Sequence, residues 1–326
     1  MFQKPSALIL SIICSIAIPL FLNAAESTAD GTDPGVEPDS ASEGSIGPYS
    51  LEGISVNRDL VYSDAGPRPL ALDLYKPADP SASALPVIVY IHGGGYRKGS
   101  KNEILEHPFF SNALLDPVAQ GKYALASIDF SKGSKRAPLE VLLTDCDNAI
   151  QWLRNGAADR ELDPERIGIV GNESGGLLAL NVGLRESEAE SQAAPLFVIA
   201  HAPATDLTKA AEAVVGSEDE EKKKIRNQLK IGMEGTLDEV PENYRDASPV
   251  NHVAEDSPPV LITVGENDAK REHAEWFGAA AEPAGANARI IVIADGSEKT
   301  DKDPVESTVD HADLVSIIQV FVREHL

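Results

Sequence analysis

Polar and apolar side chains alternate along two stretches of the chain, residues 54–63 and 70–77. This alternation is typical of strands with one buried and one solvated face, as in antiparallel pairs. Later apolar stretches are continuous instead, which predicts strands buried on both faces of a sheet. These later stretches are residues 85–96, 122–130, 166–171, 195–203, 258–265 and 288–295.

Helical patterns lie between the apolar stretches, for example at residues 142–157 and 273–283. Alternating buried strands and helices predict an α/β domain, with a mainly parallel central sheet and helices on both of its faces. In such sheets the chemistry gathers in loops at the carboxyl ends of the strands. We therefore look for candidate functional residues directly after each apolar stretch.

Composition narrows the classes of partner that the chain could bind. Its 326 residues suffice for one large domain, and the formal net charge is -24. Phosphate groups would be repelled by this charge, so nucleic acid is excluded as a partner, and so are anionic membrane surfaces.

The first residues have the layout of a secretory signal peptide. A basic start at Lys4 precedes an apolar run over residues 7–22, and the small residues Ala24 and Ala25 follow. We expect cleavage after one of these alanines, so that residues 1–25 are removed. The alternative is an uncleaved membrane anchor, because the apolar run is close to the lower limit for spanning a bilayer. Cleavage predicts a periplasmic or secreted protein with no stable membrane insertion.

The mature chain then has an acidic linker at residues 26–50 and one domain at residues 51–326. The linker is rich in Gly, Pro and Ser, a composition that does not bury enough apolar surface to order itself. Cys14 leaves with the signal peptide, so Cys146 is the one remaining cysteine and no internal disulfide can form. Cys146 is in a helical pattern, and we expect it to be a small buried hydrophobe.

The string HGGG, His92 to Gly95, follows the first continuous apolar stretch. Glycines have no side chain to obstruct their amides, so Gly93, Gly94 and Gly95 can turn N–H groups toward a ligand. On a buried strand this string is typical of an oxyanion hole, the set of donors that stabilises a negatively charged transition state.

The stretch GNESGG, residues 171–176, ends the apolar run that begins at Arg166 and predicts a nucleophile elbow, a strained turn between a strand and a helix. An elbow requires very small residues two positions before and two positions after its tip. With Glu173 at the tip these positions are Gly171 and Gly175. With Ser174 at the tip, Asn172 would occupy one of them. Sterics therefore favour Glu173, although asparagine tolerates unusual backbone angles and leaves the serine register open.

Two further candidates follow later strands. Asp268 comes three residues after the apolar stretch that ends at Gly265, and His311 begins the last amphipathic helix. Nucleophile, acid and histidine in this order match the α/β-hydrolases rather than chymotrypsin or subtilisin. His252 and His273 are expected to be bystanders. No clustered spacing of histidines and carboxylates indicates a metal site.

With these motifs the chain resembles the esterase/lipase branch of the α/β-hydrolase superfamily, the BD-FAE-like carboxylesterases related to hormone-sensitive lipases. The resemblance extends from about Leu51 to the C-terminus. It implies an α/β-hydrolase fold, a Ser-Asp-His triad and no cofactor. It also implies hydrolysis of carboxylic esters, often acetyl or feruloyl esters of polysaccharides, so the substrate would be a small-molecule or glycan ester. The matching segments are LALDLYKP, PVIVYIHGGGYRKGSK, LTDCDNAIQWLRNGAADRELDPERIGIVGNESGGLLAL, ASPVNHVAEDSPPVLITVGENDAK and DHADL.

The resemblance assigns roles to residues, and the chain departs from the pattern in two places. His92 to Gly95 match the oxyanion motif, Asp268 the triad acid and His311 the triad base, whereas the nucleophile position holds Glu173. The family usually has a tyrosine-arginine pair where this chain has Phe130 and Ser131. A charged helix at residues 216–230 lies where these hydrolases often carry a small cap over the active site.

Four interpretations of the site stay open. Ser174 could act as nucleophile with His311 and Asp268. Glu173 could form an ester intermediate, as aspartate does in related dehalogenases and epoxide hydrolases. Glu173 and His311 could activate water together. The site could instead be inert and bind a glycan, an ester or a partner. A carboxylate at the tip occupies donors that should stabilise the transition state, which opposes acyl transfer.

Overall fold

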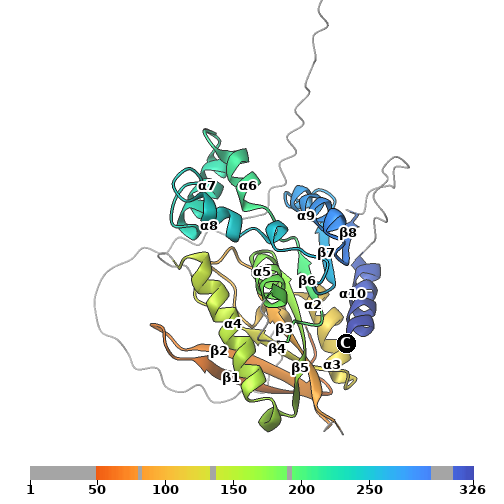
Figure 1. Ribbon diagram of the computed structural model, residues 1–326. Coiled ribbons are helices and arrows are strands. Elements are labelled where there is room, and N and C mark those ends of the chain that lie inside the picture. The colour runs from red at the N-terminus through yellow and green to blue at the C-terminus, as the bar shows by residue number, and fades with distance from the viewer. Residues whose placement is uncertain (1–48, 80–82, 133–136, 189–192, 295–310) are drawn as a thin grey trace, which may run out of the picture. The chain divides into compact units, whose positions relative to one another are not determined.

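A computed structural model of the chain describes residues 49–79, 83–132, 137–188, 193–294 and 311–326. The predicted signal peptide and nearly all of the predicted linker lie outside the described residues. In the described part, eight strands form one sheet in the order β1-β2-β4-β3-β5-β6-β7-β8 (Figure 1). The strands are β1 (Ile54–Ser63), β2 (Leu70–Pro77), β3 (Leu85–Ile91), β4 (Ala124–Ile128), β5 (Leu162–Asn172), β6 (Val198–His201), β7 (Val260–Gly265) and β8 (Ala288–Ile293).

The strand directions follow the hydrophobic patterns. The two alternating stretches form β1 and β2, which pair antiparallel, and β2 pairs antiparallel with β4. The strands β3 to β8 run parallel to one another, and the central ones are buried on both faces. The prediction of a mainly parallel sheet with an antiparallel pair is therefore confirmed.

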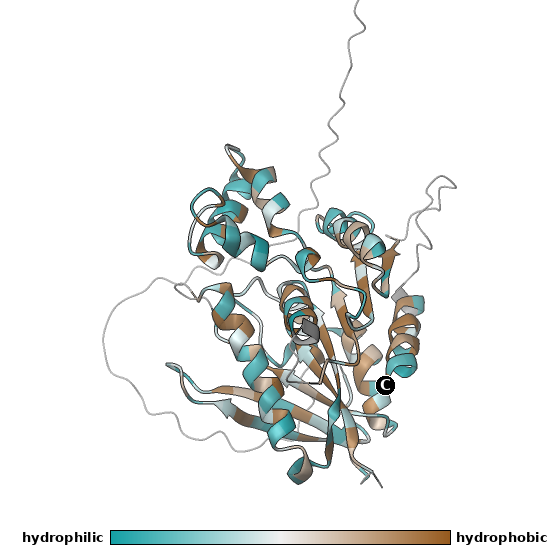
Figure 2. Ribbon diagram, viewed as in Figure 1, coloured by the Kyte–Doolittle hydropathy of each residue, from teal (hydrophilic) through white to brown (hydrophobic). Residues whose placement is uncertain are grey.

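Helices cover both faces of the sheet. The helices α4, α5 and α9 bury side chains in the hydrophobic core on one face. Examples are Leu142, Leu178 and Phe277. The short helices α1 to α3 and the C-terminal α10 contribute Phe110 and Ile318 to the core on the other face. Figure 2 shows hydrophobic strands in the middle of this arrangement. The helices are α1 (Glu103–Glu106), α2 (Pro108–Phe110), α3 (Asp116–Ala119), α4 (Leu139–Asn155), α5 (Ser174–Glu188), α6 (Leu207–Val214), α7 (Glu220–Gly232), α8 (Pro241–Asp246), α9 (Arg271–Ala284) and α10 (His311–His325).

Three helices between β6 and β7 form a cap. In Figure 1, α6, α7 and α8 cluster away from the sheet, beyond the ends of α4 and α5. The charged segment predicted to be a solvated helix forms α7, which has no fully buried residue. Cys146 in α4 is fully buried and free, as predicted for a small core hydrophobe. Among the described helices, none combines the length and the apolar character needed to cross a membrane.

Candidate active site

The turn between β5 and α5 has the geometry of a nucleophile elbow. The strand ends at Asn172 and the helix begins at Ser174, so Glu173 stands alone between them. Its φ angle is +48°, in the left-handed region that a non-glycine residue rarely adopts. The Glu173 amide donates to the carbonyl oxygen of His201 at 2.8 Å, which fixes the turn to the end of β6.

Glycines allow the close backbone approaches around this turn. A methyl group on Gly171 would lie 2.1 Å from the carbonyl oxygen of Gly175. A methyl group on Gly175 would lie 2.1 Å from the carbonyl oxygen of Ile91, at the end of β3. Space at Gly176 is less restricted, since its nearest neighbour would be Cβ of Pro203 at 3.2 Å. The two tightest positions are thus the ones that flank Glu173.

The HGGG loop lies against the elbow, and its amides already have partners. Gly95 N–H donates to Oγ of Ser174 at 3.0 Å, and Gly93 N–H donates to Oε1 of Glu103 at 2.9 Å. Oε2 of Glu173 approaches the same loop, because a methyl group on Gly93 would lie 3.3 Å from it. Two of the three amides that the sequence assigns to an oxyanion hole therefore donate to side-chain oxygens of the chain itself.

Glu103 joins three segments behind the elbow. Its Oε1 accepts hydrogen bonds from the Tyr90 hydroxyl at 2.9 Å, from Gly93 N–H and from Nδ2 of Asn172 at 3.0 Å. Burial raises the pKa of Tyr90, and the neighbouring Glu103 raises it further, so the phenol remains a donor. Sequence analysis missed Glu103, because nothing in its local pattern distinguishes it from other acidic residues at a helix start.

His92 holds the loop from its other side. The ring is fully buried and stacks on Phe130 with centroids 4.3 Å apart. Burial lowers the pKa of His92, and the neutral ring donates Nδ1–H to the carbonyl oxygen of Gly93 at 2.8 Å. Phe130, one of the two departures from the family pattern, therefore has a packing role beside the loop.

The remaining triad candidates follow β7 and precede α10. Asp268 is exposed and accepts from the amide of Lys270 at 2.7 Å. His311 begins α10, but its side chain lies outside the described residues, as does the whole segment 295–310 before it. In the described part of the chain, no group of three histidine, cysteine or acidic side chains could hold a metal ion.

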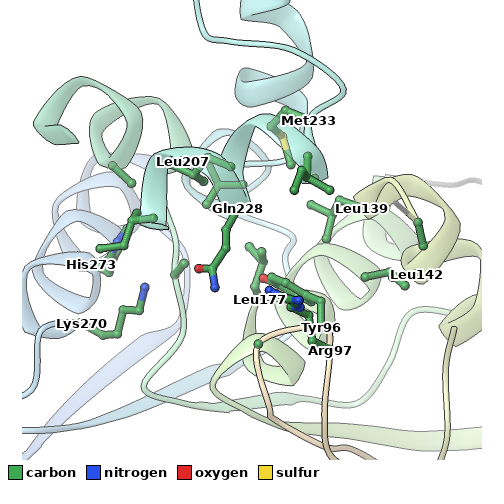
Figure 3. A pocket seen from close by; sticks show the side chains of 18 residues that line it. Tyr96, Arg97, Leu139, Leu142, Leu177, Leu207, Gln228, Met233, Lys270 and His273 are labelled. Carbon is green, nitrogen blue, oxygen red and sulfur yellow. The ribbon is translucent and has the colours of Figure 1, made fainter. Parts of the chain in front are cut away.

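A pocket of about 810 Å³ lies between the cap and the elbow. Gly95 of the HGGG loop and Leu177 of α5 line it on the elbow side, and Leu207 and Met233 line it from the cap (Figure 3). Leu177 is one helical turn after the elbow, and its amide donates to the carbonyl oxygen of Glu173. The pocket therefore lies next to the elbow tip, Glu173, which is the position of the nucleophile in such enzymes.

His273, which the sequence predicts to be a bystander, lines this pocket. It is 6% exposed, and its Nδ1 accepts from the Thr205 amide at 3.1 Å. Burial lowers the pKa of His273 to about 4, and the nearby Lys270 lowers it in the same direction. The ring is therefore neutral, with its proton on Nε2. The signal was its position only five residues after Asp268, where the segment that follows β7 turns into α9.

The strand order, the elbow and the cap define the protein as an α/β-hydrolase. Within that class the chain belongs to the BD-FAE family, whose model matches residues 72–274, more than half of its length. Curated relatives include Esterase LipC of Mycobacterium tuberculosis, 28% identical over 222 residues, which are 65% of this chain and 51% of the relative. Esterase LipQ of the same organism is 28% identical over 70% of this chain and 53% of the relative. The chain thus spans about half the length of these two relatives.

Solved structures share the fold. Carboxyl esterase 2 of the fungus Tuber melanosporum superposes with a TM-score of 0.64 at 24% identity, covering 85% of this chain and 90% of the other. A structure described as Bacterial Heroin Esterase gives a TM-score of 0.66 at 19% identity, covering 86% of each chain. At these identities the likeness is one of fold.

Proposed function

We propose that the protein binds carboxylic esters in the pocket under its cap and hydrolyses them only feebly. Two findings support ester binding: the chain belongs to an esterase family, and a pocket lies beside the elbow. One observation supports the feeble turnover: Glu173 occupies the tip where the nucleophile of such an elbow stands.

The chemistry of the tip gives the physical reason. Acyl transfer needs a nucleophile that attacks the carbonyl carbon, and amide donors that stabilise the oxyanion formed. Here the tip carries a carboxylate beside Gly93, and the Gly95 amide already donates to Oγ of Ser174. Loss of one oxyanion donor alone commonly slows such a reaction about 100-fold or more.

The test is a serine at the tip. Glu173→Ser should raise hydrolysis of p-nitrophenyl acetate about 100-fold over the native protein, because it supplies a nucleophile and removes the competing anion. Adding Ser174→Ala should raise it further, since Gly95 N–H is then free for the oxyanion. Ser174→Ala alone is the matched control and should leave the slow native rate unchanged.

A second candidate function is hydrolysis through Ser174, and the position of its hydroxyl favours it. Oγ of Ser174 lies 3.0 Å from the Gly95 amide, at the loop where an acyl group would bind. Fast native hydrolysis that Ser174→Ala abolishes would establish this serine as the nucleophile and overturn the first proposal.

We also propose that the protein is exported. The support is the sequence of residues 1–25, with its basic start, its apolar run and its small residues before the acidic segment. The mature protein would then act on esters in the periplasm or outside the cell.

A further inference from the structure

The polar side chains that line the pocket under the cap include two cations. Lys270 and Arg97 each contribute a positive charge, and Tyr96, Gln228 and His273 contribute hydrogen-bond donors. No aspartate or glutamate is among the described residues that line it. This is unexpected in a chain whose formal net charge is -24. The pocket is thus a region of positive charge and donors within an acidic protein.

Lys270 is a partly buried cation that forms no ion pair with the described residues. Burial lowers the pKa of its ammonium group, and the charges of Asp268 and Glu173 act in the opposite direction. Among the described residues, no carboxylate forms an ion pair with either Lys270 or Arg97, whereas surface lysines such as Lys223 do have acidic partners. A desolvated charge is unfavourable until an opposite charge reaches it. A ligand anion would provide that charge.

His273 adds a donor to the same wall. Because its Nδ1 accepts from the amides of Thr205 and Asp206, the ring proton is on Nε2, and the neutral ring offers a donor there. Next to it, Lys270 contributes an ammonium group, which only donates. A carboxylate, which only accepts, is the complement of this pair.

The rest of the pocket is apolar. Figure 3 shows Leu207 and Met233 of the cap on one side, and Lys270 and Arg97 on the side of the elbow. Gln228 reaches from α7 between these two sides. A ligand that matches both sides has an apolar body and one charged end.

We propose that the pocket selects an amphipathic carboxylate: a ligand with an apolar chain or ring and an ionised carboxyl group, which Lys270 and His273 bind. Among esters, this class comprises the half-esters of dicarboxylic acids. This assignment rests on the proposed function, in which the pocket binds esters. It adds that the ligand must carry a negative charge.

The test compares one ligand body with and without that charge. Isothermal titration calorimetry of the full-length protein would use 4-phenylbutanoate and its neutral analogue 4-phenylbutanamide. The native protein should bind the carboxylate at least about tenfold more tightly, which is the contribution of one charge-assisted contact. Glu173→Gln should strengthen carboxylate binding further, because it removes the anion that competes for Lys270.

Lysine variants identify the residue responsible. Lys270→Gln should weaken binding of the carboxylate about tenfold and change that of the amide less than about twofold. Lys270→Arg should keep the preference. Lys224→Gln is the matched control: it removes the same charge from an exposed position on α7 outside the pocket, and should change neither affinity.

Each outcome separates the inference from the proposed function. Equal affinity of the native protein for the two ligands overturns the charge requirement while the pocket still binds the amide, and this comparison needs no variant to fold. A preference that survives Lys270→Gln overturns the role of Lys270. Failure of both ligands to bind overturns the assignment of an amphipathic carboxylate, whereas the ester-binding function is tested separately by hydrolysis of p-nitrophenyl acetate.

Discussion

At the scale of single residues, His273 lines the pocket and has a pKa that burial lowers. Its pKa in the folded protein is about 4, below the value near 6.5 of an unperturbed histidine. The unfolded chain therefore binds a proton more readily than the folded one. The stability that depends on the neutral ring is complete above about pH 6.5 and is lost as the pH falls through about 4.

A pH series should detect this loss. Between pH 7.5 and pH 5.0 the free energy of unfolding should fall by about 2 kcal/mol through His273 alone. His273→Gln should remove this part of the pH dependence, because glutamine does not titrate, although the variant starts from a lower stability. Urea unfolding at both pH values measures the change in the free energy of unfolding. His252→Gln leaves His273 in place and should retain the loss, and an identical pH dependence of the native protein and His273→Gln would contradict the argument.

At the scale of elements, the junction of β5, α5 and the HGGG loop depends on backbone segments that approach one another closely. Gly175 is at the centre of this junction, against the last residue of β3. The atoms that a larger side chain would meet belong to the backbone of the central sheet and have little freedom to move.

Alanine substitutions test the junction. Gly175→Ala should lower the free energy of unfolding by about 3 kcal/mol, because its methyl group would lie 2.1 Å from the carbonyl oxygen of Ile91. Gly176→Ala, one residue further along α5, should change stability by less than about 1 kcal/mol, since a mild contact is offset by better helix propensity. Urea unfolding of the pair gives the difference. Equal stabilities of Gly175→Ala and Gly176→Ala would show that the elbow can rearrange, and that Ser174 can reach its tip.

At the scale of the whole molecule, the proposed export signal would determine where the mature chain begins. Cleavage after Ala24 or Ala25 leaves a chain that begins with an acidic segment and carries Cys146 as its one thiol. A large domain does not need a disulfide to be stable, so export is compatible with this composition.

Mass spectrometry of the intact protein checks the cleavage. Protein recovered from the periplasm or medium of a bacterial host should have the mass of a chain that starts at residue 25 or 26. A variant with Ala24 and Ala25 both replaced by bulky leucine should retain the full-length mass. A native protein that keeps its first residues and stays with the membrane would instead support the uncleaved anchor.

Local pattern alone determined the sheet and the elbow. The period of the apolar residues distinguishes half-buried from fully buried strands, and a side chain's face depends only on its place in that period. The close approach of Gly171 to the backbone of Gly175 is a steric limit within one turn of the chain. Such features could be predicted because their physical causes act between residues close together in the sequence.

Tertiary structure alone decided which side chains meet at the site. Glu103 and Asn172 are 69 residues apart and share a hydrogen bond, and Ser174 accepts from Gly95 across 79 residues. Lys270 and Arg97 likewise come from distant loops to line one pocket. These contacts cannot be predicted from a local period or spacing. They form when long-range packing brings the carboxyl ends of separate strands together under a cap. The sequence therefore determined where chemistry gathers, and only the fold decided that the donors there are partly occupied and that the pocket beside them is cationic.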